Sequence, residues 1–269
     1  MNAASWEALG SNLAATAGAA AAVLLLAFAV GTARRLHRTA DIAWGLAFAA
    51  VAVVSYVLSA GYGDGGRRLL VATATVVWGL RLAVHLAWRG RGHGEDPRYA
   101  ELLARGRGNP QVRALLTVYL LQAGLVWLVS LPVQTASYVD SPVGVPDALG
   151  AALWAAGLGF EAVGDFQLAR FKADPAHRAA VMDRGLWAWT RHPNYFGDSL
   201  VWWGLYLPAC GTWRAALLCL VSPLVMTLLL TVGSGKRLLE ARMADRPGFA
   251  DYTARTSGFF PLPPRGGRA

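Results

Sequence analysis

The sequence predicts an all-α membrane protein, a single domain over residues 1–269 built as a bundle of about seven transmembrane helices. Hydrophobic residues make up 55% of the chain, and the mean hydropathy is +0.38. Charged residues make up only 15%, whereas about a quarter is usual in a soluble domain. Apolar runs of roughly 20 residues recur along the chain, which is the length that an α-helix needs to cross a bilayer.

Seven apolar segments are the predicted spans. In chain order they are 12–32, 40–60, 69–88, 112–131, 147–166, 195–209 and 213–232. The sixth is short, which predicts a tilted, broken or partly interfacial helix. No basic stretch precedes the first, and Arg34, Arg35 and Arg38 follow it. That flank is typical of a retained span rather than a cleaved signal peptide.

Basic residues predict the orientation of the bundle. Segments 33–39, 89–113, 170–191 and 233–269 hold 21 of the 25 Lys and Arg residues, and the loop 132–146 holds none. The positive-inside rule then puts the N-terminus outside and the C-terminus in the cytoplasm. We expect an integral protein of the cell membrane, of the bacterial inner-membrane kind, surrounded by membrane lipids. The net charge of +9 is spread over short loops, so a nucleic-acid partner is not expected.

Common metal and nucleotide motifs are missing from the sequence. Cys210 and Cys219 lie nine residues apart, without CxxC spacing or a Cys/His cluster, so no metal site is expected. No GxGxxG follows a strand pattern and no P-loop occurs, which excludes a soluble Rossmann module. The oligomeric state is left open by the sequence.

Ionisable side chains within the spans are the first candidates for function. Each costs about 2.5–3.5 kcal/mol at the centre of a bilayer, so it usually faces a cavity or a partner. Asp41 and Asp198 lie at or near span ends, and Arg81 and His85 are four apart on one face of the third span. We expect a water-accessible cavity open to the cytoplasm. A packing salt bridge, for example Arg81 with Asp41, is the alternative.

Glu161 and Asp165 are also four residues apart, in "FEAVGDFQLARFK". Like charges at this spacing repel on a helix. Their placement favours hydrogen-bond donors on a ligand, such as ribose hydroxyls. Pairing with Arg170 or Lys172 is the alternative.

The segment "GLWAWTRHPNYFGDSLVWWG", residues 185–204, predicts a break between helices with an anion site beside it. Pro193 removes a backbone donor and disfavours helical geometry at the residue before it. Asn194 is predicted to cap a helix that begins at Tyr195, whose first N–H groups could bind an anion. Arg184 and Arg191 flank two tryptophans, which suits phosphate pairing and ring stacking. An interfacial turn with an aromatic belt is the alternative.

Three stretches resemble the bacterial DUF1295 proteins, which group with the steroid 5-alpha-reductase-like membrane enzymes. They are "FEAVGDFQLARFKADP", "GLWAWTRHPNYFGDSLVWWG" and "FADYTARTSGFFPLPP". The resemblance is strongest over 160–263, and "DIAWG" and "GEDPRY" also fit it. The "RHPNYFG" region is similar as well to that of isoprenylcysteine carboxyl methyltransferases, which use S-adenosylmethionine.

The resemblance implies a seven-helix bundle that reduces an enone double bond with NADPH. Residues 1–146 would form the substrate side, and residues 147–269 would bind the cofactor. Tyr252 and Arg255 in the tail would close the site over the nucleotide. Together with the charge pattern, the resemblance implies cofactor contacts at Glu161, Asp165, Lys172, Arg184, Arg191, His192, Asn194, Tyr195, Asp198, Tyr252 and Arg255.

The catalytic groups of the reductases, a Glu in the second helix and a Tyr in the third, have only partial counterparts. Asp41 and His85 are the candidates, no tyrosine matches in the third span, and Tyr56 and Tyr119 are fallback donors. We expect a reductase of a C=C bond in a lipid or steroid-like substrate that enters from the bilayer. The alternatives are an S-adenosylmethionine-dependent lipid methyltransferase and a non-enzymatic lipid-binding or transport protein. Dense arginines suit the phosphates of NADPH better than a sulfonium cation.

Overall fold

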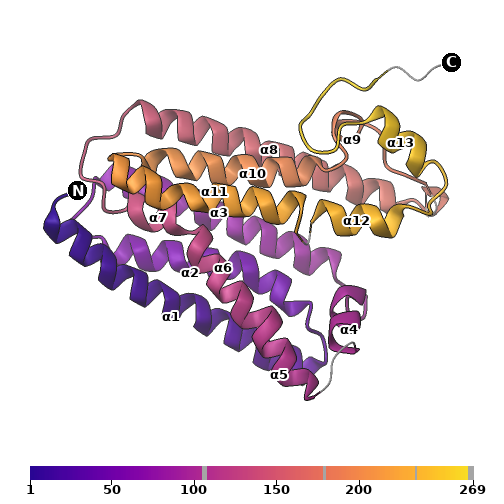
Figure 1. Cartoon of the computed structure of the whole chain (residues 1–269), viewed down its shortest axis with the longest axis horizontal. Helices are drawn as coiled ribbons and strands as arrows, with labels where there is room; N and C mark the ends of the chain where they lie inside the picture. The colour runs from indigo at the N-terminus through magenta and orange to yellow at the C-terminus, as the bar shows by residue number, and fades with distance from the viewer. Residues whose placement is uncertain (105–107, 178–179, 234, 266–269) are drawn as a thin grey trace. The chain divides into compact units, whose positions relative to one another are not determined.

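A computed structural model describes residues 1–104, 108–177, 180–233 and 235–265. All of its regular structure is helical, apart from one isolated parallel bridge between Thr190 and Ser257 (Figure 1). The predicted all-α class is confirmed. In chain order the helices are α1 (Ala3–Arg34), α2 (Thr39–Leu58), α3 (Gly65–Arg89), α4 (Pro97–Ala104), α5 (Pro110–Ala114), the π-helix η1 (Leu115–Leu120), α6 (Leu121–Val129), α7 (Leu131–Ala136), α8 (Val145–Ala173), η2 (Pro175–His177), α9 (Leu186–Trp189), α10 (Pro193–Tyr206), η3 (Leu207–Ala209), α11 (Trp213–Thr231), α12 (Lys236–Met243) and α13 (Phe249–Arg255).

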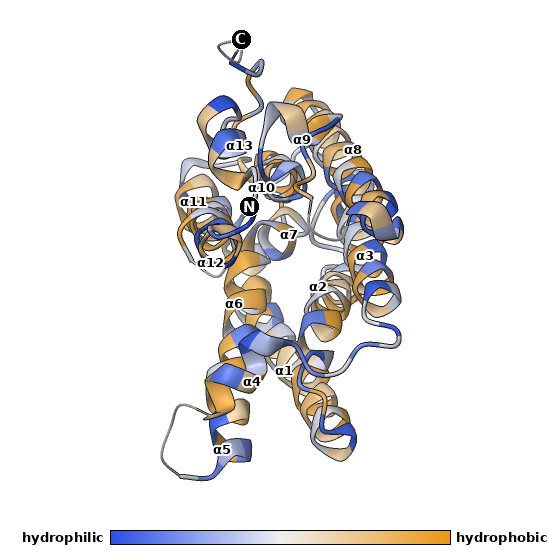
Figure 2. Ribbon diagram, turned by 90° about the vertical axis from the view of Figure 1, so that its right-hand side faces the viewer, coloured by the Kyte–Doolittle hydropathy of each residue, from blue (hydrophilic) through white to orange (hydrophobic). Residues whose placement is uncertain are grey.

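The chain is an integral membrane protein. Within the described residues, five segments are long and apolar enough to cross a bilayer: Ala3–Arg34, Thr39–Leu58, Gly65–Arg89, Pro110–Val129 and Trp213–Met243. They coincide with the first four and the last of the predicted spans. Figure 2 shows apolar residues along α6 and hydrophilic residues on α4 and α13.

The two remaining predicted spans correspond to α8 and α10. Helix α10 has 14 residues and is therefore about 21 Å long, shorter than the roughly 30 Å hydrocarbon core. Helix α8 has 29 residues, and it carries three buried carboxylates, Asp147, Glu161 and Asp165. The count of seven spans and the orientation stay predictions.

The chain forms two compact units, which are described separately. Unit 1 comprises Met1–Asp147 and Leu205–Ser222, and unit 2 comprises Ala148–Gly204 and Pro223–Ala269. Helices α8, α10 and α11 each contain the point at which the chain passes from one unit to the other. Both candidate sites below lie within single units.

In unit 1, helix α2 packs against α1 and α3 (Figure 1). The crossing of α2 and α3 depends on Gly45 and Gly79, since a Cβ on Gly45 would lie 2.3 Å from the Gly79 carbonyl oxygen. Fully buried Phe48 and Trp78 fill the same interface, with ring centroids 5.4 Å apart. Small residues at the crossing let the helix backbones approach closely, as is usual where lipid provides no hydrophobic drive.

A buried network of neutral polar side chains joins α1, α2 and α7. The Asn12 Nδ2 donates to Ser55 Oγ at 3.3 Å, and the Thr16 hydroxyl donates to Gln134 Oε1 at 2.5 Å. The Gln134 Nε2 donates to the Trp127 carbonyl at 3.1 Å, beside the break between α6 and α7. Because polar groups need partners in an apolar interior, this network fixes how the helices meet.

In unit 2, helices α8 and α10 run antiparallel along a line of glycines. A Cβ on Gly157 would lie 2.6 Å from the Gly197 carbonyl oxygen, and one on Gly204 would lie 2.6 Å from the Trp154 nitrogen. Helix α10 also joins α11 through Ser199 and Thr227, whose hydroxyl oxygens are 2.8 Å apart. This close packing brings the polar residues of α8 against the start of α10.

Candidate functional site

The first polar cluster surrounds Asp41, in the first turn of α2. Helix α4 supplies its partners: Arg98 Nη2 donates to Asp41 Oδ2 at 2.8 Å, and the Tyr99 hydroxyl donates to Asp41 Oδ1 at 2.5 Å. The carboxylate of Asp96 holds the same guanidinium, accepting from Arg98 Nε and Nη2 at 3.0 Å each. Both Asp41 oxygens therefore accept hydrogen bonds, as suits a carboxylate next to an arginine.

The neighbouring Glu95 lies in the loop before α4 and anchors it to the start of α2. Its carboxylate accepts hydrogen bonds from the backbone N–H groups of His37 and Arg38, the latter at 3.0 Å. These N–H groups lie where a helix leaves its first donors without intrahelical partners, and an acidic side chain there is stabilising. The stretch "GEDPRY" thus places Arg98 and Tyr99 against Asp41 by docking on α2.

Tyr99 is only 7% exposed. Burial and the adjacent Asp41 carboxylate raise the pKa of the Tyr99 phenol well above its usual range. The hydroxyl consequently keeps its proton at physiological pH and acts as a hydrogen-bond donor.

Tyr119, a fallback donor, lies on the π-helix η1, and π-helical turns often occur at functional sites. Its hydroxyl oxygen is 3.2 Å from His37 Nδ1 and 3.1 Å from Thr39 Oγ1. The hydroxyl is therefore fixed at the entry of α2. The other fallback donor, Tyr56, lies near the far end of α2 under the guanidinium of Arg68, 5.0 Å from its ring centroid.

His85, the second catalytic candidate, lies on α3 and is half-buried. Its ring centroid is 6.3 Å from that of Trp88. Asp41 takes its described hydrogen bonds from Arg98 and Tyr99 on α4.

The second polar cluster is at the helix break before α10, in unit 2. The Thr190 hydroxyl donates to the Phe259 carbonyl at 2.8 Å, and Thr190 pairs with Ser257 in the isolated bridge. The Trp187 indole N–H donates to the Gly164 carbonyl at 3.0 Å. The break is thereby tied both to α8 and to the C-terminal tail.

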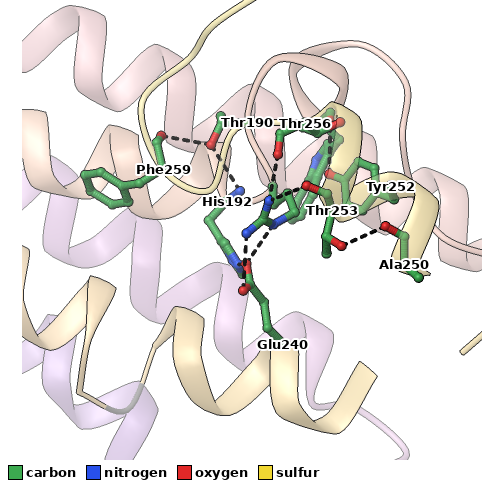
Figure 3. Close-up of polar contacts among 10 residues, drawn as sticks. Thr190, His192, Glu240, Ala250, Tyr252, Thr253, Thr256 and Phe259 are labelled. Carbon is green, nitrogen blue, oxygen red and sulfur yellow. Dashed lines mark hydrogen bonds and ion pairs between the residues drawn. The ribbon is translucent and has the colours of Figure 1, made fainter. Parts of the chain in front are cut away.

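Arg191 is a clamp on the tail, and its partners Glu240, Thr253 and Thr256 are labelled in Figure 3. Its Nε donates to Glu240 Oε1 at 2.8 Å, and its Nη1 donates to the carbonyls of Thr253 and Thr256 at 3.2 and 2.6 Å. Its Nη2 lies 3.4 Å from Glu240 Oε2. Four of the five guanidinium N–H donors are thus engaged within the protein, which leaves little of Arg191 for a phosphate.

His192 lies beside this clamp and is 6% exposed. Its Nε2 is 3.0 Å from Glu240 Oε1, and its ring stacks on Tyr195 with centroids 5.2 Å apart. Burial lowers the pKa of the His192 imidazole despite the nearby carboxylate. The neutral ring with its proton on Nε2 fits this geometry, because that N–H can donate to Glu240.

Asn194 bonds differently from the prediction. Helix α10 begins at Pro193, which suits a first helical position, so the predicted cap of a helix starting at Tyr195 is wrong. The Asn194 Nδ2 instead donates to Asp165 Oδ1 at 3.1 Å, and its buried Oδ1 has no hydrogen-bond partner among the described residues. Such an atom is an acceptor to which a ligand could donate.

The α8–α10 interface gathers the predicted acidic residues. Glu161 is 3% exposed and Asp165 is 6% exposed, and the Glu161 backbone nitrogen lies against Gly197. Asp198 is half-buried and follows Asn194 by one helical turn, so both lie on the same side of α10. The structure therefore brings Glu161, Asp165, Asn194 and Asp198 to one helix crossing.

A family described as "Protein of unknown function (DUF1295)" matches residues 27–256. The chain is a member of the DUF1295 family. It matches no curated protein and no solved structure. The matched residues include Asp41 of the first cluster and most of the second, from Glu161 to Thr256, but not Ser257 or Phe259.

The remaining basic candidates of this DUF1295 protein lie at the surface of unit 2. Lys172, Arg184 and Arg255 are exposed, and Arg255 pairs with the Asp183 carboxylate. The Tyr252 hydroxyl donates to the Trp187 carbonyl at 2.7 Å, so Tyr252 secures the tail. Of the residues predicted to pair with phosphate, Lys172 and Arg184 are thus exposed, whereas Arg191 is engaged within the protein.

Sequence reasoning missed several residues of both clusters in this DUF1295 member. Glu240 and Lys236 come from α12, and a Cβ on Gly258 would lie 2.6 Å from the Lys236 Nζ. Nothing in the local pattern distinguishes Glu240 from an ordinary surface acid. For Arg98 and Tyr99 a signal existed, since "GEDPRY" is a polar stretch in an apolar chain.

Proposed function

We propose that this protein is an NADPH-dependent reductase of a C=C bond conjugated to a carbonyl in a lipophilic substrate. The observation that carries the proposal is the Tyr99 hydroxyl held by Asp41, since reduction of an enone builds negative charge on the carbonyl oxygen. A fixed donor at that oxygen stabilises the transition state. Asp41, Tyr99 and Arg98 would serve the substrate, and unit 2 would bind the nucleotide.

The residues of unit 2 fit a dinucleotide in their donor and acceptor chemistry. The buried Asn194 Oδ1 is an acceptor for an amide N–H or a ribose hydroxyl. Asp165 and Glu161 are carboxylates suited to ribose hydroxyls, and exposed Arg184 and Lys172 are suited to phosphates. When bound, NADPH supplies the hydride equivalent.

The residues of unit 1 supply the polar side of the reaction. Tyr99 Oη keeps its proton because of burial and the facing carboxylate, and this single proton would turn from Asp41 Oδ1 to the carbonyl oxygen when a substrate binds. Arg98 balances the charge of Asp41 and keeps that carboxylate in place. A reduction needs one proton in addition to the hydride, and the half-buried Asp41 and Arg98 give this cluster access to water.

Nucleotide binding is the first test. Purified protein in detergent is titrated separately with NADPH and with S-adenosylmethionine, and the unfolding temperature is followed. We expect stabilisation by NADPH, reduced in an Asn194→Leu variant. Stabilisation by S-adenosylmethionine alone would point to a lipid methyltransferase, and stabilisation by neither would favour a lipid-binding or transport role.

Turnover is the second test. NADPH oxidation is followed at its absorbance band with a long-chain enone as substrate, and the product is identified by mass spectrometry as the enone plus two hydrogens. A Tyr99→Phe variant, which folds around the same ring but lacks the hydroxyl, is the matched control. Equal rates with and without the enone would reject the reductase.

A further inference from the structure

Three large apolar side chains are exposed where the C-terminal tail passes α9, in unit 2. Phe260 is 66% exposed, Leu262 is 54% exposed, and Trp189, the last residue of α9, is 47% exposed. The backbone N–H of Leu262 donates to the Trp189 carbonyl at 3.0 Å, so these residues belong to one surface. We call Trp189, Phe260 and Leu262 the tail patch. Exposed apolar residues that gather in this way usually mark an interaction surface.

The tail patch lies at the start of α10. The Phe260 ring centroid is 6.1 Å from that of Phe196, in the first turn of α10, and 5.4 Å from that of Phe259. Phe196 in turn packs edge to face on Phe160 of α8, with centroids 5.4 Å apart. Helix α10 corresponds to the sixth predicted span, which begins at Tyr195, so the patch lies beside the end of that span. This is the level at which a span meets the lipid headgroups, and aromatic side chains are enriched there.

Two arginines lie at the ends of the tail segment that carries the patch. The Arg265 backbone N–H donates to the Arg255 carbonyl at 2.9 Å, which closes residues 256–265 into a loop. Both arginine side chains are exposed. The Asp183 carboxylate pairs with Arg255, so the three residues together keep a positive charge. Basic residues next to apolar ones suit an anionic phospholipid surface, because the arginine stem packs on apolar groups while the guanidinium pairs with phosphate.

The proline-rich sequence of the tail prevents a helix from forming that could bury the patch. Pro261, Pro263 and Pro264 surround Leu262, and proline both fixes φ and removes the backbone donor that a helix needs. The chain is an integral membrane protein, so the bilayer is the nearest apolar phase for a surface beside the end of a span. Transfer of apolar side chains from water to that phase is favourable in proportion to the area removed from water.

We propose that the tail patch is an interfacial anchor that binds the surface of the bilayer. Phe260 and Leu262 insert where the headgroups meet the acyl chains, Trp189 lies at the headgroup level, and Arg265 pairs with the phosphate of an anionic phospholipid. The tail is then held at two places, by the Arg191 clamp and by lipid. This inference is independent of the proposed reductase, because it requires neither nucleotide nor enone.

Depth measurements on the full-length chain test the anchor. In a variant with Cys210→Ser and Cys219→Ala, which removes both cysteines, a spin label is attached through Leu262→Cys or, as the control, through Ala250→Cys. Ala250 is exposed on α13, and it lies well away from Phe259 in Figure 3. In nanodiscs of equal parts phosphatidylglycerol and phosphatidylcholine, we expect collisions with oxygen to predominate at position 262, and collisions with a water-soluble nickel chelate to predominate at position 250.

Cleavage by trypsin after Arg255 reports how often the tail detaches. In the same nanodiscs, we expect the double variant Phe260→Ser/Leu262→Ser to be cut about tenfold faster than the wild type, because two apolar side chains no longer leave water when the tail docks. Leu238→Ser is the matched control, since Leu238 is an exposed leucine on α12, outside the patch. It should be cut at the wild-type rate.

The role of lipid charge is tested on the wild type. Transfer from the mixed nanodiscs to nanodiscs of phosphatidylcholine alone should raise the rate of cleavage after Arg255 about fivefold, the contribution of one arginine near an anionic surface. Arg265→Gln should be cut equally fast in both kinds of nanodisc. The lipid comparison leaves the chain unchanged, so its result does not depend on the folding of a variant.

Three outcomes would overturn the anchor. Nickel collisions as frequent at position 262 as at position 250 would show that the patch faces water. Exclusion of both reagents from position 262 would show that protein covers the patch, as in a dimer of this chain. Equal cleavage of the wild type in the two kinds of nanodisc would reject an anionic phospholipid as the partner. Predominant oxygen collisions at position 262, together with faster cleavage in neutral lipid, support the anchor whether or not the protein oxidises NADPH.

Discussion

Arg191 in unit 2 and Arg98 in unit 1 both form several hydrogen bonds through the guanidinium group, but to different kinds of partner. In unit 2, Arg191 donates to the backbone carbonyls of Thr253 and Thr256 as well as to Glu240. In unit 1, the described side-chain bonds of Arg98 all go to carboxylates, those of Asp96 and Asp41. The bonds of Arg191 fix the backbone of the C-terminal tail. Those of Arg98 place a positive charge beside the Asp41 carboxylate that accepts from Tyr99.

This difference shows that an arginine within a recognisable motif is not necessarily a ligand-binding residue. Arg191 belongs to "RHPNYFG", the stretch with the strongest resemblance, yet its geometry is that of a structural clamp. Arg98 belongs to the less prominent "GEDPRY" and adjoins Tyr99, which is the donor in the proposed enone reduction. A guanidinium that bonds carbonyl groups stabilises a fold, and one that bonds carboxylates can adjust a reactive site.

The largest expected effect is the loss of the clamp. Arg191→Met removes hydrogen bonds to two carbonyls and the partner of Glu240, and breaking such a partly buried ion pair costs about 3–5 kcal/mol. We expect the tail after α13 to become sensitive to protease and the unfolding midpoint in detergent to fall. Limited proteolysis with mass spectrometry and denaturant titration measure the two effects.

Arg191→Lys is the matched variant, since it keeps the charge but cannot form the forked contacts. We expect it to recover little of the protection of the tail. If Arg191→Met weakens NADPH binding while the tail stays protected, Arg191 is a phosphate ligand and the contrast with Arg98 fails.

The second prediction concerns unit 1. Tyr99→Phe removes the hydroxyl and keeps the ring, so kcat for enone reduction should fall by about 10²-fold, the usual cost of one oxyanion donor. NADPH affinity should stay unchanged, because the nucleotide residues belong to unit 2. Steady-state kinetics with a nucleotide titration check both expectations, and an unaltered kcat would remove Tyr99 from the mechanism.

A third, smaller effect is expected at Asn194. Asn194→Leu removes the open acceptor and the hydrogen bond to Asp165, which should weaken NADPH binding by about tenfold. Ser199→Ala, on the same helix but bonded to Thr227, is the control and should bind the nucleotide normally. An equal loss in both variants would indicate a general disturbance of α10 rather than a nucleotide contact.

The sequence was sufficient for the helical class and for most apolar segments, because lipid requires continuous apolar runs. It also located the break before α10, since the signal of Pro193 is local. It could not join Tyr99 to Asp41, which lies 58 residues earlier in the chain, because no helical period relates two separate helices to one another. It likewise mistook Asn194 for a cap, since the carboxylate of Asp165 comes from another helix.

The smallest expected effect is a pH dependence of unit 2. Burial lowers the pKa of His192 below the value of about 6.5 that an unfolded chain has. The unfolded state then binds a proton more readily than the folded state, so the stability from neutral His192 is complete above about pH 6.5 and is lost as the pH falls through the lower, folded pKa. We expect the unfolding midpoint of the wild type to decrease between about pH 7.5 and pH 5, and His192→Gln, whose amide can still donate to Glu240, to flatten that part of the curve. If the unfolding midpoint of His192→Gln falls with pH as steeply as that of the wild type, groups other than His192 cause the acid sensitivity.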